Sequence, residues 1–83
     1  MDKIQKAVYD RVKQHCEYAK STRCVPVLIM HSLLLEIMRK PEHGGYDGAE
    51  VNAALRVLYS DRKIAAGKTA HGCYITLPEY AGK

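Results

Sequence analysis

The chain has 83 residues, of which 47% are apolar and 27% are charged, and its formal net charge is +4. This length allows one domain with a compact core, and the composition is that of a globular protein and excludes a disordered one. The most apolar run, residues 25–38, contains a proline and a glutamate and is shorter than the roughly 20 residues of a membrane span, so we expect no membrane partner.

The amino-terminal residues are charged every few positions and have no apolar signal core, so we expect a cytoplasmic protein. A first helix is predicted over residues 2–19, because every fourth residue from Ile4 to Cys16 is apolar. Residues 24–27 follow a break in this period. We expect them to be extended, as a short strand, because Pro26 does not fit a helix interior.

A second helix is predicted over residues 28–39. Its inward arc is expected to contain most of its apolar residues, namely Ile29, Met30, Leu33, Leu34, Ile37 and Met38. Leu28 and Leu35 fall among the polar positions, one heptad apart. They are either buried under the first helix or form an exposed apolar stripe, which in a small protein is typical of a partner or self-association surface.

A third helix is predicted over residues 48–60, with Asp47 as its N-cap and Glu50 three residues later, as in a capping box. Its inward residues are expected to be Val51, Ala54, Leu55 and Leu58. Alternating apolar residues then predict a β-hairpin over about 63–77, with a loop between two glycines at 67 and 72.

Two details of the carboxyl-terminal region follow from the same pattern. Cys73 is in phase with Ile75 and Leu77, so we expect its side chain in the core. The last five residues, 79–83, follow Pro78 and are expected to fray.

The stretch AEVNAALRVLYSDRKIAAGKTAHGCYITL (49–77), together with the helices before it, resembles a winged helix-turn-helix domain. The resemblance covers nearly the whole chain and implies an α+β fold with three helices and a carboxyl-terminal hairpin, the wing. It also implies that the third helix enters the major groove of duplex DNA and that the wing touches the backbone. The matching positions are Asn52, Arg56, Tyr59 and Ser60 on the helix, Lys63, Lys68, Thr69 and His71 near the wing, and more weakly Arg39 and Lys40 as backbone contacts.

Two functions remain open at this point. The resemblance favours a small transcription-related regulator that binds DNA, either alone or as a homodimer on two half-sites. The charge distribution favours a protein-interaction or dimerisation module instead, because residues 41–83 hold five basic and five acidic residues and the whole positive excess lies in residues 1–40.

Other function classes are disfavoured. Gly67-Lys68-Thr69 has the ending of a phosphate-binding P-loop, but Arg62 stands where the motif needs its first glycine, and a strand follows instead of a helix, so we expect no nucleotide. The three cysteines and four histidines lack the spacing of a metal site. The chain shows no pairing of a nucleophile with a base, so we expect no enzyme and no cofactor.

Overall fold

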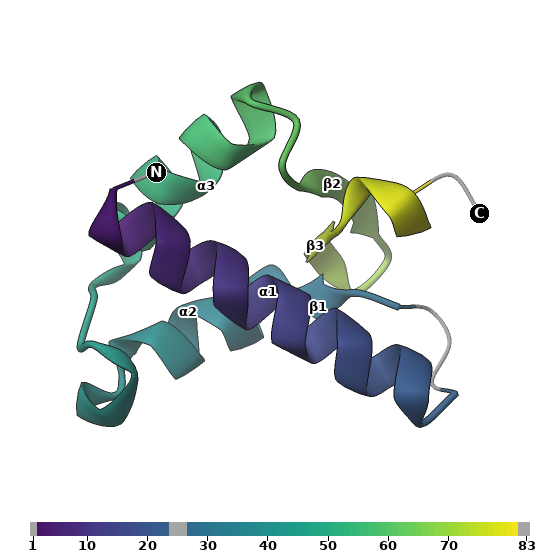
Figure 1. Ribbon diagram of the computed structural model, residues 1–83, viewed down its shortest axis with the longest axis horizontal. Coiled ribbons are helices and arrows are strands. Elements are labelled where there is room, and N and C mark those ends of the chain that lie inside the picture. The colour runs from purple at the N-terminus through teal and green to yellow at the C-terminus, as the bar shows by residue number, and fades with distance from the viewer. Residues whose placement is uncertain (1, 24–26, 82–83) are drawn as a thin grey trace.

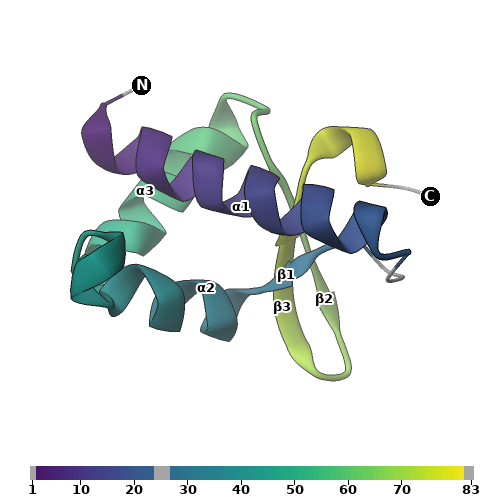
Figure 2. The same ribbon diagram turned by 60° about the horizontal axis from the view of Figure 1, so that its bottom comes forward.

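The computed structural model describes residues 2–23 and 27–81, and these form a small α+β structure with three helices and a three-stranded antiparallel sheet (Figure 1). The elements are α1 (Lys3–Ser21), β1 (Ile29–Met30), α2 (His31–Arg39), α3 (Gly48–Ser60), β2 (Ala65–Thr69) and β3 (Gly72–Thr76). Two short 3-10 turns, η1 (Pro41–His43) and η2 (Pro78–Tyr80), follow α2 and β3. The strand order is β1-β3-β2, and the β2–β3 hairpin extends away from the helices (Figure 2).

Helix α1 has the apolar face that the sequence predicts. Asp2 caps it, because the Asp2 side chain accepts a hydrogen bond of 3.0 Å from the backbone N–H of Gln5. Its buried residues are Val8, Val12, Cys16 and Ala19. Arg11, on the same helix, reaches η1 and donates from Nη2 to Nδ1 of His43 over 2.8 Å. One of the basic residues of α1 is therefore used inside the fold.

The segment between α1 and α2 differs from its prediction. Most of the strand expected at residues 24–27 lies outside the described residues, and Val27 is not in a strand. Strand β1 is formed by Ile29 and Met30, which pair with β3. This pairing requires extended backbone, so α2 begins at His31 and not at residue 28.

The residues of α2 that face the core differ in part from the predicted set. Leu34 and Met38 are buried, whereas Leu33, which was expected to face inward, is 39% exposed. Leu28 precedes β1 and is half-buried, and Leu35 packs against the core. Leu28 and Leu35 therefore do not share one helix face, which excludes the alternative of an exposed stripe on α2, because Leu28 precedes β1 and Leu35 belongs to α2.

Helix α3 runs over the range that the sequence predicts. Its N-cap is Asp47, whose Oδ1 accepts a hydrogen bond of 2.9 Å from the backbone N–H of Glu50. The four residues expected to face inward are buried, namely Val51, Ala54, Leu55 and Leu58. Helix α3 therefore packs one side on the core and leaves the other toward solvent.

The end of α3 is a Schellman turn, which directs the chain into the hairpin. The backbone N–H of Arg62 donates to the carbonyl of Tyr59 (3.0 Å), and that of Lys63 donates to the carbonyl of Leu58 (2.9 Å). Arg62 has a φ of 60°, in the left-handed region where this turn ordinarily has glycine. An arginine therefore occupies a strained backbone position between α3 and β2.

The hairpin loop is shorter than expected. Thr69 and Gly72 are paired, so only Ala70 and His71 connect the strands, and Gly72 supplies the positive φ of 123° that closes the turn. Gly67, expected to begin the loop, lies within β2 opposite Tyr74. A Cβ at Gly67 would overlap the ring of Tyr74, so this glycine permits close cross-strand packing.

Cys73 is exposed, which contradicts its predicted place in the core. Three consecutive residues of the strand end, Ile75, Thr76 and Leu77, are buried. The two-residue period fails there because both faces of β3 are covered near its carboxyl end, whereas Cys73 lies nearer the tip, where the hairpin extends beyond the helices (Figure 2).

The carboxyl end of β3 is attached to two other parts of the chain. Thr76 is buried, and its Oγ1 donates to the carbonyl of Val27 over 2.6 Å and lies 3.8 Å from Sγ of Cys16. Beyond it, Tyr80 packs against the core under Nζ of Lys20, 5.7 Å from the ring centroid, so the predicted fraying is wrong for this residue.

Candidate nucleic-acid interface

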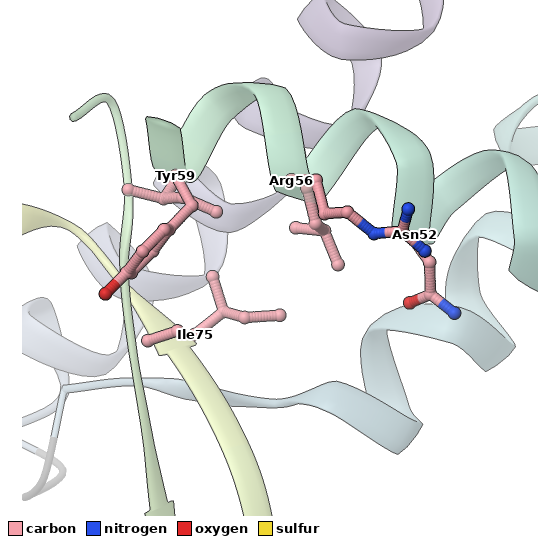
Figure 3. Close-up of a pocket in the computed structure, with 7 residues that line it drawn as sticks. Asn52, Arg56, Tyr59 and Ile75 are labelled. Carbon is pink, nitrogen blue, oxygen red and sulfur yellow. The ribbon is translucent and has the colours of Figure 1, made fainter. Parts of the chain in front are cut away.

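An open groove of about 330 Å³ lies between the solvent side of α3 and the hairpin (Figure 3). Its polar lining comes from α3, where Asn52, Arg56 and Tyr59 occupy successive turns. Its floor is apolar and comes from both elements, namely Leu55, Ile64, Ala66 and Ile75. The groove thus joins three residues expected to read DNA with the base of the predicted wing.

The three polar side chains are arranged along the groove. Figure 3 shows the Arg56 side chain running along α3 toward Asn52, and the Tyr59 ring pointing from the other end of the helix toward the hairpin. Arg56 is exposed and Tyr59 is 58% exposed, so both are accessible. Ser60 is also exposed, but it lines a second, adjoining hollow with Arg62 and Pro78.

Asn52 is held by a residue that the sequence pattern does not single out. Nε2 of His31, the first residue of α2, lies 2.7 Å from Oδ1 of Asn52, and both side chains are half-buried. His31 belongs to α2 and Asn52 to α3, and only the packing of α2 on α3 brings them together. No spacing along the chain indicates this contact, because the two residues are 21 positions apart.

The predicted wing residues lie on the hairpin or just before it. Lys63, Lys68 and His71 are exposed. Thr69 is exposed too, but its hydroxyl is used within the turn: Oγ1 accepts from the backbone N–H of His71 (3.1 Å) and donates to the carbonyl of Gly72 (3.2 Å). The lysines at 63 and 68 are therefore better suited to phosphate contact than Thr69.

The two weaker candidates, Arg39 and Lys40, are not part of this groove. They line a separate hollow at the carboxyl end of α2, together with Leu33 and Ile37. Figure 2 shows that this end of α2 points away from the hairpin. The structure therefore separates Arg39 and Lys40 from the residues around Arg56.

The acidic residue at the start of α3 also lies elsewhere. Glu50 lines a hollow with Asp2 and Gln5 of the α1 end. The residues that line the α3–hairpin groove include none with a carboxylate. The groove therefore has positive charge without an adjacent acidic residue in its lining, which favours an anionic ligand.

The described residues also bear on metal binding and on thiol chemistry. Within residues 2–23 and 27–81, no group of three His, Cys, Asp or Glu side chains could hold a metal ion. Burial raises the pKa of the Cys16 thiol, and its hydrogen bond to Thr76 opposes this shift. Cys16 is thus a packed thiol with a disfavoured thiolate.

None of the helices in these ranges combines the length and apolar character of a membrane-crossing segment.

The chain was compared with protein families, with curated proteins and with solved structures. It matches no family model, and neither a curated protein nor a solved structure is significantly similar to it.

Proposed function

We propose that the chain is a winged-helix protein that binds duplex DNA, as a small transcription-related regulator. The α3–hairpin surface, defined as Asn52, Arg56, Tyr59, Lys63 and Lys68, would form the interface. One observation carries the proposal: helix α3 and the hairpin border a single open groove, so the candidate base-reading side chains of α3 lie beside the predicted wing.

The arrangement of the elements supports this proposal. Along the chain a helix, a short strand, two helices and a hairpin follow one another, and β3 lies between β1 and β2. The three helices and the carboxyl-terminal hairpin of this order are what the resemblance to winged-helix domains implies. The hairpin extends past the helices (Figure 2), as a wing must do to reach a backbone beside the groove occupied by α3.

The residue types on the surface suit two kinds of contact. Arg56 projects from the exposed side of α3 and has the donor fork that reads guanine in the major groove. Lys63 and Lys68, on the hairpin side, carry charges that pair with phosphates without reading sequence. DNA bound here would engage α3 through its bases and the hairpin through its backbone.

The test is fluorescence anisotropy with a labelled duplex of mixed sequence over a range of salt concentrations. Because each lost phosphate contact lowers the salt slope by about 1, Lys68→Ala should weaken binding and reduce the slope by about that amount. Arg56→Ala should weaken binding by about fivefold or more, since it removes a base contact. Lys13→Ala on α1 is the matched control, because it removes one exposed charge outside the surface.

An NMR titration locates the contact independently of affinity. Duplex DNA at about 50 mM salt, a concentration at which phosphate contacts are weakly screened, should shift the amide signals of residues 52–60 and 67–71. A wild-type protein that shows neither anisotropy change nor shifts in these segments would contradict DNA binding. If Lys13→Ala and Lys68→Ala lose the same DNA affinity, the interface lies elsewhere on the protein.

A protein-interaction or dimerisation module is the second candidate function, and one observation favours it. Leu33 is 39% exposed on α2 and lines a hollow of about 430 Å³ with Ile37 and Pro41. The apolar side of this hollow suits a protein partner better than DNA, and its other side carries Glu36, Arg39 and Lys40. Concentration-dependent sedimentation, abolished by Leu33→Ser, would support self-association through this hollow.

A further inference from the structure

The outer edge of β2 is unpaired in the part of the chain that the structure describes. In the strand order β1-β3-β2, one side of β2 pairs with β3, and no described strand pairs with its other side (Figure 2). The pairing with β3 is continuous from Ala65 to Thr69, so the strand keeps its regular alternation of backbone groups. Such an edge presents N–H and C=O groups that can pair with a further strand.

A hollow of about 460 Å³ lies across this edge. It is lined by Ala65 and Ala66, neighbouring residues of β2 whose side chains point to opposite faces of the sheet. A hollow that touches both residues lies across the outer edge, because β3 occupies the inner one. Its lining also includes Tyr59 from α3 and Pro78, which follows β3. The two small alanine side chains leave room for another backbone to approach.

The α3–hairpin groove adjoins this hollow and provides space for side chains (Figure 3). The two linings share Tyr59, Ile64 and Ala66. Since alternate residues of a strand point to the same face, every second side chain of a strand added to β2 would point to the face that bears Ala66, where Leu55 and Ile75 form an apolar floor. Main-chain pairing with pockets for alternate side chains is how sheet edges recognise extended peptides.

The charge beside the edge is positive. Residues 62–78 contain Arg62, Lys63 and Lys68 and no Asp or Glu. Arg62 lines the hollow and Arg56 lines the groove, and none of the described residues in either lining carries a carboxylate. A second copy of the chain that paired through its own β2 would bring like charges together. Charge complementarity therefore favours an acidic partner over a homodimer at this edge.

We propose that the outer edge of β2 binds an extended acidic peptide segment of another protein by β-strand addition. The peptide backbone pairs with β2, its apolar side chains point toward the floor of the groove, and its carboxylates offset the charges of Arg62 and Lys68. Duplex DNA is also acidic, but it cannot supply the alternating N–H and C=O groups that a strand edge requires. The inference goes beyond the proposed DNA binding and does not rest on it, although both ligands would use Lys68.

The probe is a fluorescein-labelled peptide of about eight residues in which glutamate and valine alternate, followed by fluorescence anisotropy. It should bind the wild type with a Kd below about 1 mM, and a peptide that alternates lysine with valine should not bind. Lys68→Glu should weaken binding about fivefold. Lys13→Glu, which reverses an exposed charge on α1, is the matched control and should leave binding unchanged. Failure of the acidic peptide to bind, or equal losses in the two variants, would overturn the inference.

A second peptide and hydrogen exchange separate strand addition from charge attraction. In the second peptide proline replaces each valine, so the charge is the same but the backbone adopts polyproline geometry and does not pair with a strand. It should bind at least about fivefold more weakly. Peptide binding should also slow the exchange of alternate β2 amides, those that point away from β3. Equal binding of the two peptides, or unchanged exchange in β2, contradicts strand addition.

The remaining outcomes identify a different occupant or a different function. If the peptide-free protein sediments as a dimer in which these β2 amides are already protected, the edge binds a second copy and the inference is overturned. If duplex DNA binds and the acidic peptide does not, the proposed function stands and the inference is overturned. If the peptide binds and DNA does not, the inference stands without DNA binding.

Discussion

Two threonines show how the base and the tip of the hairpin differ. Thr76, at the base, is 3% exposed, and its hydroxyl bonds to the carbonyl of Val27, 49 residues away in the chain. Thr69, at the tip, is exposed, and among the described residues its hydroxyl bonds to His71 and Gly72 beside it. The Thr76 hydroxyl thus joins the base to a distant segment, whereas the Thr69 hydroxyl bonds within the turn itself.

This difference follows from where the helices lie. Helix α1 packs on the base and places Cys16 against Thr76, whereas the tip extends past the helices (Figure 2). A hairpin that is anchored at one end and exposed at the other holds a fixed direction while its end remains accessible. The proposed contact of Lys68 with a DNA backbone depends on both properties.

The largest expected effect concerns the two described cysteines, which lie on either side of this division. In a Cys24→Ser variant, Cys73 should react with iodoacetamide at least about a hundredfold faster than Cys16. Cys73 is exposed, whereas Cys16 is fully buried, and its modification must wait for an opening that costs several kcal/mol. Peptide mass spectrometry over time measures both rates of alkylation. Equal rates would show that the reagent reaches Cys16 at the base of the hairpin as easily as it reaches Cys73.

The raised pKa of Cys16 adds a dependence on pH. The folded state holds the thiol protonated to a higher pH than the unfolded state, whose thiol ionises near the ordinary value of 9.0. As the pH rises past 9, the unfolded state is therefore favoured progressively, and this contribution to stability is lost. In Cys16→Ala the free energy of unfolding should therefore fall less between neutral and alkaline pH than in the wild type. Urea titrations at several pH values measure this.

The next effect is the loss of the buried hydroxyl at the base. Thr76→Val keeps the shape of the side chain but leaves the Val27 carbonyl without its donor, so we expect a loss of about 1–3 kcal/mol in the free energy of unfolding. Thr69→Val, the matched change at the exposed tip, should cost less than about 0.5 kcal/mol. Urea denaturation compares the two, and similar losses would contradict the difference between base and tip.

The smallest effect concerns the turn that leads into the base. Arg62 has a φ of 60°, and glycine there would remove the strain of a side chain in the left-handed region. Since glycine also gains freedom in the unfolded state, Arg62→Gly should stabilise the protein by only about 0.5–1 kcal/mol. Arg62→Ala keeps the strain and is the control. A gain of the same size in Arg62→Ala would assign the effect to the arginine side chain.

Regular local patterns were sufficient to predict much of the fold. The four-residue period of α1 and the capping sequence at Asp47 predict the two helices that the structure contains there. The turn at Gly72 also follows from local chemistry, since a positive φ favours glycine. In each case the physical cause lies within a few residues, where the sequence displays it directly.

Other positions depend on partners that are distant in the sequence. Ile29 and Met30 continue the helical pattern of residues 28–39, but pairing with β3 makes them extended. Gly67 has the chemistry of a turn residue, but it lies in a strand because Tyr74 packs over it. In both places a tertiary contact outweighed the local preference.

The candidate site divides in the same way. The sequence alone determined the chemical character of the α3–hairpin surface, since Asn52, Arg56 and Lys68 carry their donors and charges wherever the chain places them. Only the tertiary structure decided that Arg56 shares a groove with the hairpin, that Arg39 does not, and that the oxygen of Asn52 is bound by His31. The reason is that side-chain chemistry is a property of each residue, whereas proximity depends on how helices and strands pack around the core.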